Sequence, residues 1–291
     1  MLHYFAPKKV RVCAHSQIPP SATQIEFNAP QRSIHSILHK CTHCTLPNQP
    51  LPDVLPSRPT HLTLQNFNLP LPILPSSLTE LTLGDAFNRP VNNLPSSILK
   101  LKFGKQFNQP IDNLPPPLHK LTLGKDFNNP VDNLPPSLSK LKFCAEGAFN
   151  YPVDHLPSQL IYLSLSSSFT HSLTNLPSSL TFLWIYPNSR PTIGKLPLAL
   201  KRLLISDSDI ISDESNTLTS FSWPTTLQQL MLVAIYSQGF ESIPQTLTQL
   251  SLMHPLDGHE VLVPSLPPSL SLVLNYMGDS PLPSTWSHFL L

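Results

Sequence analysis

The chain has 291 residues, a net charge of +1 at pH 7 and only 12% charged residues. This small, balanced charge argues against a nucleic-acid binder that relies on bulk positive charge, and no apolar run approaches the roughly 18 residues that a membrane span needs. The 35 prolines against eight glycines would by themselves indicate disorder. However, 40% of the residues are apolar, which is enough to bury a continuous core.

The N-terminal stretch MLHYFAPKKVRV lacks the apolar segment of a secretory signal peptide. The four cysteines are not spaced as a disulfide framework, so the sequence predicts a cytoplasmic protein with reduced thiols. Val10 and Val12 alternate with Arg11, which predicts a short strand. We interpret residues 1–17 as an N-terminal cap or half repeat.

Residues 18–30, IPPSATQIEFNAP, are the first copy of a pattern that becomes clearer further along the chain. Residues 31–54 are interpreted as a degenerate copy. In this copy Cys41 is assigned to the place of a strand leucine, because it lies seven residues before Asn48, as Leu81 lies seven before Asn88.

From Leu74 the pattern repeats without gaps. The successive units read LPSSLTELTLGDAFNRPVNN, LPSSILKLKFGKQFNQPIDN, LPPPLHKLTLGKDFNNPVDN and LPPSLSKLKFCAEGAFNYPVDH. A period of about 20 residues is typical of a solenoid, in which each unit buries its apolar face against the next.

Each unit is expected to contain one short strand. Leu81 and Leu83 are two residues apart, as strand alternation requires, and the prolines of the FNxP half resist helix formation. The phenylalanines of this half are expected to form a second buried column, and the asparagines beside them to bond backbone groups of the adjacent coil. The predicted columns contain Phe87, Phe107, Phe127 and Phe149, and Asn88, Asn108, Asn128 and Asn150. The sequence thus predicts an all-β protein, a parallel β-solenoid with coils of about 20 residues and almost no helix.

After residue 200 the pattern loosens. The segment Ser212–Thr219 is interpreted as a surface loop, and residues 282–291, LPSTWSHFLL, as a C-terminal cap. An open end of a solenoid exposes sheet edge and core, which a cap covers. We therefore expect one solenoid over residues 18–281, degenerate at residues 31–54 and after residue 200.

The motif L-P-x-S-L-x-x-L-x-[LF]-G-x-x-F-N-x-P-[IV] resembles the FNIP repeat, a family of social amoebae and of giant viruses that infect amoebae, related to leucine-rich repeats. The match is strongest over residues 74–152. The resemblance implies a right-handed, leucine-rich-repeat-like parallel coil with a role in protein interaction. Some viral members carry an N-terminal F-box, and we expect none in the 17 residues before the first repeat.

Residues that flank the strand leucines are expected to point outward on the concave face of the sheet. At these positions lysines of successive units are followed by aromatic residues. The candidate partner-binding residues are Lys100, Lys102, Lys120, Lys140, Lys142, Tyr162, Phe182, Trp184, Tyr186 and Arg202. Stacked like charges repel one another, and exposed aromatics beside basic groups are common in interfaces. One interpretation is a docking site for a partner with an acidic stretch followed by an apolar anchor. The other is that the lysines keep the sheet soluble and the aromatics cover each other.

A histidine- and cysteine-rich stretch suggests zinc, because Cys-x2-Cys with nearby histidines has ligand spacing. Its residues are His35, His39, Cys41, His43 and Cys44. The alternative is that Cys41 fills a leucine position as a small apolar residue. We favour the alternative and predict no metal and no other cofactor.

The sequence contains no nucleophile elbow, phosphate-binding loop or H-E-x-x-H motif. Asp112, Asp132 and Asp154 recur once per unit, which indicates turn chemistry and not a pair of catalytic carboxylates. We therefore predict a non-catalytic scaffold that binds a protein on its concave face, with no nucleic-acid or membrane partner. The alternative function is the substrate-recognition arm of a ubiquitin ligase.

Overall fold

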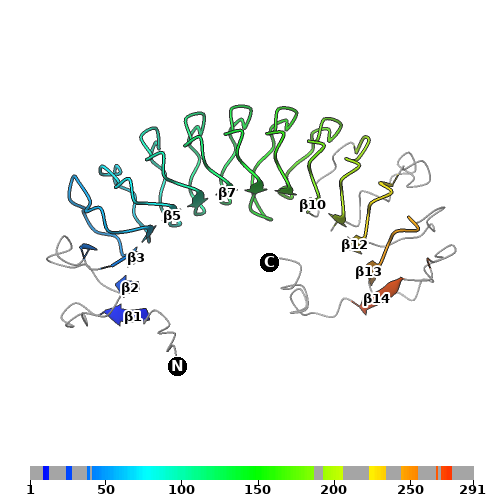
Figure 1. Ribbon diagram of the computed structural model, residues 1–291, viewed down its shortest axis with the longest axis horizontal. Coiled ribbons are helices and arrows are strands. Elements are labelled where there is room, and N and C mark those ends of the chain that lie inside the picture. Colours follow the sequence, from blue (N-terminus) through cyan, green and yellow to red (C-terminus); the bar gives the residue numbers. More distant parts are fainter. Residues whose placement is uncertain are drawn as a thin grey trace, which may run out of the picture.

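The computed structural model describes residues 9–12, 24–27, 38–39, 41–186, 193–205, 223–233, 244–254, 267 and 270–276. These residues contain a single parallel sheet of 14 strands, ordered from β1 to β14 along the chain (Figure 1). The predicted loop at residues 212–219 and the predicted cap at residues 282–291 lie outside the described residues.

The first seven strands are β1 (Lys9–Val12), β2 (Gln24–Phe27), β3 (His43–Leu46), β4 (His61–Leu64), β5 (Glu80–Leu83), β6 (Lys100–Phe103) and β7 (Lys120–Thr122). The remaining seven are β8 (Lys140–Lys142), β9 (Tyr162–Ser164), β10 (Phe182–Ile185), β11 (Arg202–Ile205), β12 (Gln229–Val233), β13 (Gln249–His254) and β14 (Ser271–Tyr276). No helix is among the elements assigned to the described residues, so the predicted β-solenoid is confirmed.

Strand register follows the repeat period. Leu81 is paired with Leu101, Leu101 with Leu121, and Leu121 with Leu141. All four are at most 1% exposed, so stacking one coil on the next buries a leucine column that no single strand could bury alone.

The phenylalanines form the second column that the repeat predicted. Successive rings from Phe67 to Phe169 stack with centroids 6.1–6.4 Å apart. Phe107 is fully buried and also stacks on Phe103 of β6, with centroids 3.7 Å apart. The return half of each coil is thereby fixed against the strand half.

Asparagine side chains connect the return segments of neighbouring coils. The Oδ1 atom of Asn88 accepts a hydrogen bond from the backbone N–H of Asn108 at 3.0 Å, and that of Asn108 accepts one from the N–H of Asn128 at 2.9 Å. The same bond recurs before and after these coils. The predicted ladder is confirmed, and it satisfies N–H groups that have no strand partner.

The glycine after the strand allows successive coils to approach closely. A Cβ built on Gly124 would lie 1.8 Å from the carbonyl oxygen of Gly104, far inside van der Waals contact. A larger residue here would force the two coils apart.

The stacked coils curve into an arc (Figure 1). The strands lie along its inner side and the return segments along its outer side. The sheet therefore has one face against the core and one face toward the hollow of the arc, and only the second is available to a ligand.

Candidate functional site

The concave face of the sheet contains a groove of about 380 Å³ over β5 to β9. It is lined by Leu81, Leu101 and Leu121 of the strands and by outward-facing residues beside them. Five of the predicted site lysines line it, Lys100, Lys102, Lys120, Lys140 and Lys142, together with Tyr162. The structure therefore brings six of the ten predicted residues into one site.

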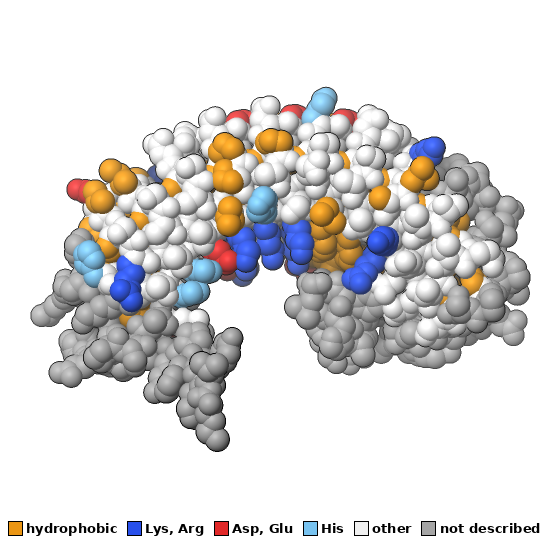
Figure 2. Space-filling view, in the orientation of Figure 1, with side chains coloured by type: hydrophobic (Ala, Val, Ile, Leu, Met, Phe, Trp, Pro, Cys, Tyr) orange, Lys and Arg blue, Asp and Glu red, His pale blue; other side chains and the backbone are white. Residues whose placement is uncertain are grey.

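Strand register sets the lysines in two rows. Lys100, Lys120 and Lys140 are directly paired across β6, β7 and β8, and in the second row Thr122 separates Lys102 from Lys142. Neighbouring strands are about 4.8 Å apart, so these lysines leave the sheet from closely spaced positions. Figure 2 shows Lys and Arg side chains gathered on the inner rim of the arc.

The electrostatics of the groove reflect this crowding. Partial burial lowers the pKa of Lys142, and the positive charges of Lys120 and Lys102 lower it further. Among the described residues, no carboxylate lies within ion-pair distance of Lys102, Lys120, Lys140 or Lys142. The middle of the groove therefore has positive charge that the described chain does not neutralise.

One end of the groove is acidic. Glu80 of β5 accepts a hydrogen bond from Lys100 at 2.6 Å, and its Oε1 lies 3.2 Å from Nε2 of His61. Partial burial raises the pKa of Glu80, but the Lys100 hydrogen bond and the charges of His61 and Lys100 outweigh it, and the pKa is lowered. Glu80 is thus a carboxylate that marks where the positive surface ends.

The other end is aromatic. The rings of Tyr162 and Phe182 stack with centroids 4.3 Å apart, and those of Trp184 and Tyr186 with centroids 4.4 Å apart. The sequence predicted exposed aromatics, and this is wrong for Phe182, Trp184 and Tyr186, which are 6%, 5% and 9% exposed. They pack with Leu204 and Met231 in a separate hydrophobic cluster. Only Tyr162, at intermediate exposure, borders the groove.

Arg202 is placed in line with the aromatics but outside the groove. It is paired with Phe182 on one side and Gln229 on the other, and it is partly exposed.

Burial raises the pKa of the Tyr162 and Tyr186 hydroxyls, so both stay neutral at physiological pH. The aromatic end therefore contributes shape and apolar surface, and no charge.

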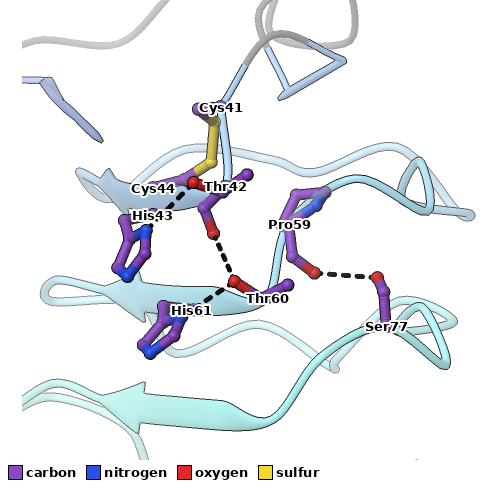
Figure 3. Close-up of a disulfide and its surroundings, with 8 residues drawn as sticks. All are labelled: Cys41, Thr42, His43, Cys44, Pro59, Thr60, His61 and Ser77. Carbon is purple, nitrogen blue, oxygen red and sulfur yellow. Dashed lines mark hydrogen bonds between the residues drawn. A yellow bond between two sulfur atoms is a disulfide. The ribbon is translucent and has the colours of Figure 1, made fainter. Parts of the chain in front are cut away.

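A second, smaller depression lies nearer the N-terminus, over β2 to β5. The imidazole rings of His43 and His61 stack there with centroids 3.8 Å apart. Each Nδ1 atom lies within hydrogen-bond distance of the preceding threonine hydroxyl, 3.0 Å from Thr42 and 2.8 Å from Thr60 (Figure 3). These bonds fix both rings on the concave face.

The cysteines near this depression are joined to each other. Cys41 and Cys44 form a disulfide with Cα atoms 6.0 Å apart (Figure 3). The expectation of reduced thiols is therefore wrong for this pair, while Cys144 is a free thiol. A disulfide sulfur is not a thiolate ligand. No group of three or more potential metal ligands occurs among the described residues, which include His39 but not His35.

The assignment of the leucine position to Cys41 is also corrected. Cys44 is the residue paired with Ile25 on β2 and Leu62 on β4, so Cys44 occupies the place equivalent to Leu81. The error arose because Asn48 follows β3 more closely than Asn88 follows β5. Both cysteines are nevertheless buried as small apolar residues.

Sequence reasoning missed two contributors. Glu80 was not among the predicted site residues, and its interactions with Lys100 and His61 were not expected. Met231 was not assigned to the aromatic cluster, although its register with Leu204, and through it with Trp184, could have indicated this.

Within the described residues, no helix has the length and apolar character needed to cross a membrane.

Comparison with known proteins supports the repeat assignment. The family model for the FNIP repeat matches residues 47–86, 67–106 and 107–145. No curated protein matches the chain.

Among the matches to solved structures are the following two, of which the first is similar in fold. The crystal structure of CroV588, a circular leucine-rich-repeat protein of the giant virus CroV, is 26% identical, with a TM-score of 0.61 over 89% of this chain and 47% of that chain. YopM from Yersinia enterocolitica WA-314 is 19% identical, with a TM-score of 0.45 over 91% of this chain and 76% of that chain. The present chain thus spans about half the length of the circular viral protein. Residues 47–145 thus match the FNIP repeat, and the chain has a leucine-rich-repeat-like fold.

Proposed function

We propose that this protein is a non-catalytic scaffold that binds a protein partner on the concave face of its sheet, over β5 to β9. The observation that carries the proposal is the groove of about 380 Å³, lined by exposed lysines and placed in the hollow of the arc. Solenoids of this kind generally use their concave surface for interaction.

The chemistry of the groove favours binding over catalysis. Its titratable groups are five lysines, one tyrosine and Glu80, and Glu80 is held as a carboxylate by Lys100 and His61. Lys142 is the groove lysine with a lowered pKa, and among the described residues no carboxylate lies within ion-pair distance of it to act as a partner in proton transfer. A surface with repeated positive charge is instead suited to recognising a partner of opposite charge.

The proposal is tested by site-specific photo-crosslinking in a lysate of the native host. One variant has p-benzoylphenylalanine in place of Thr122, which lines the groove, and the matched variant has it in place of Asn113 in an exposed turn of a return segment. A protein crosslinked at position 122 is identified by mass spectrometry, purified and tested for binding to the purified full chain.

The expected result is a purified partner that binds directly and crosslinks at position 122 but not at position 113. A partner set that crosslinks equally at both positions, or one that fails to bind when purified, would contradict recognition by the concave face.

A further inference from the structure

We infer that the groove over β5 to β9 recognises an acidic, extended segment of the partner, with its carboxylates over β6 to β8 and an apolar side chain against Tyr162. This inference rests on the proposed function and specifies the chemistry of the partner. It also restricts the apolar contact to Tyr162, because Phe182, Trp184 and Tyr186 of the predicted aromatic group are buried.

Charge is the first argument. Lys102, Lys120, Lys140 and Lys142 converge on one groove, and no carboxylate of the described chain lies within 4.0 Å of their ammonium groups. Partial burial lowers the pKa of Lys142, and the neighbouring charges of Lys120 and Lys102 lower it further, so the charged form of this side chain is disfavoured in the free protein. Carboxylates placed among these groups would relieve that repulsion.

Geometry is the second argument. The lysines of the first row are about 4.8 Å apart because they stand on successive strands, while side chains on one face of an extended segment recur at about 6.8 Å. Lysine is a flexible point charge and does not require the fixed bidentate geometry of arginine. The lysine side chains can therefore reach carboxylates despite the difference between the two spacings.

The ends of the groove limit the acidic stretch. At β5, Glu80 already forms an ion pair with Lys100 and would repel a further carboxylate. At β9, the partly buried Tyr162 ring stacks on Phe182 and offers an apolar surface with a neutral hydroxyl. The bound segment is therefore expected to be acidic over three strands and apolar at the end that lies over β9.

The same features favour a protein segment over a single-stranded nucleic acid. Sequence-tolerant binding of nucleic acid uses exposed aromatic platforms for the bases, but Phe182, Trp184 and Tyr186 are buried in their own cluster. No arginine is among the described residues that line the groove, although arginine is the usual bidentate contact for phosphate.

The experiment measures fluorescence anisotropy of labelled peptides with the purified full chain. The probe is a peptide of roughly eight residues, long enough to cross the groove when extended, with alternating glutamates and a leucine at each end. Matched probes carry glutamine in place of glutamate, and a labelled oligoadenylate RNA serves as the nucleic-acid probe.

Two triple variants are compared. Lys102→Gln, Lys120→Gln and Lys140→Gln together remove charge from the groove, and Lys125→Gln, Lys195→Gln and Lys201→Gln remove the same charge elsewhere. Glutamine keeps the side chain long and polar, and circular dichroism verifies that each variant is folded.

The expected result is binding of the glutamate peptide that is weakened about tenfold or more in the groove variant, because three ion pairs are lost, and much less in the control variant. High salt should also weaken binding. Equal binding of the glutamine peptide, equal weakening by both variants, or tighter binding of the RNA through the same lysines would overturn the inference. If the acidic peptide does not bind but a partner crosslinks at position 122 and binds when purified, the acidic inference alone fails and the concave-face proposal stands.

Discussion

Glu80 and Lys100 face each other on adjacent strands, and the Lys100 ammonium lies 2.6 Å from Oε1 of Glu80. The same carboxylate oxygen lies 3.2 Å from His61. Glu80 is therefore the boundary between a positively charged groove and a depression lined by two histidines. It limits the positive charge that an incoming partner meets.

The substitution Glu80→Gln should strengthen binding of the glutamate peptide by roughly threefold, because it removes a like charge and releases Lys100. Its effect on stability should be below about 1 kcal/mol, since both side chains are partly exposed and solvent screens the pair. Anisotropy titration and urea unfolding measure the two effects. Asp126→Gln, an exposed acid outside the groove, is the control, and unchanged or weaker peptide binding in Glu80→Gln would contradict this reading of the groove.

The substitution Phe107→Ala should reduce the free energy of unfolding by about 3–5 kcal/mol. Phe107 is fully buried and stacks on Phe87, Phe103 and Phe127, so its removal opens a cavity between the strand and return halves of three coils. Urea unfolding followed by circular dichroism measures the loss. Tyr151→Ala, at a residue 37% exposed, should change stability by roughly 0.5 kcal/mol or less; a similar cost for both variants would argue against a buried phenylalanine column.

The asparagine ladder can be tested with two residues five positions apart. Asn108→Ala removes the acceptor of the Asn128 N–H and of the Asn129 side chain, and should cost about 1 kcal/mol of stability. Asn113→Ala, in an exposed turn, should cost no more than roughly 0.5 kcal/mol. Chemical denaturation of both variants checks this, and equal values would show that the Asn108 side chain contributes no more than a surface residue.

The disulfide predicts a specific pattern of alkylation. After unfolding in denaturant without reductant, Cys144 should react with iodoacetamide, while Cys41 and Cys44 should react only once a reductant is added. Peptide mass spectrometry of the two samples distinguishes the sites. Full alkylation of Cys41 and Cys44 without reductant would show that the pair is reduced, and would reopen the question of zinc at this position.

The histidine pair predicts a pH dependence with a definite sign. Partial burial and the charge of His61 lower the pKa of His43, and the charge of Glu80 opposes them without cancelling them. A histidine whose folded pKa lies below its unfolded value of about 6.5 favours the neutral form. Its contribution to stability is therefore present above that value and is lost as the pH falls toward the folded pKa.

NMR titration of the His43 ring should give a midpoint below about 6.5. The midpoint should move upward in His61→Gln, which removes the neighbouring charge, and downward in Glu80→Gln, which removes the compensating one. A midpoint that is unaffected by either substitution would show that the stacked rings do not interact electrostatically.

The architecture of the repeats follows from the order of residues along the chain. The period of about 20 residues places Leu81, Leu101, Leu121 and Leu141 in one register, because each coil has the same length and each leucine the same place in its strand. The phenylalanine column and the asparagine ladder follow from the same periodicity. Strand alternation also identified the outward-facing lysines.

The neighbours of each side chain on that outward face could be identified only in the folded chain. Alternation assigns Trp184 to the side opposite Leu183, but it cannot show that Trp184 packs with Tyr186, Leu204 and Met231 and is buried. The pairing of Cys41 with Cys44 and of Glu80 with Lys100 likewise depends on distances between side chains. Periodicity fixes the direction in which a side chain leaves the backbone. Its burial and its ion pairs depend instead on which side chains of the neighbouring strands lie within contact distance.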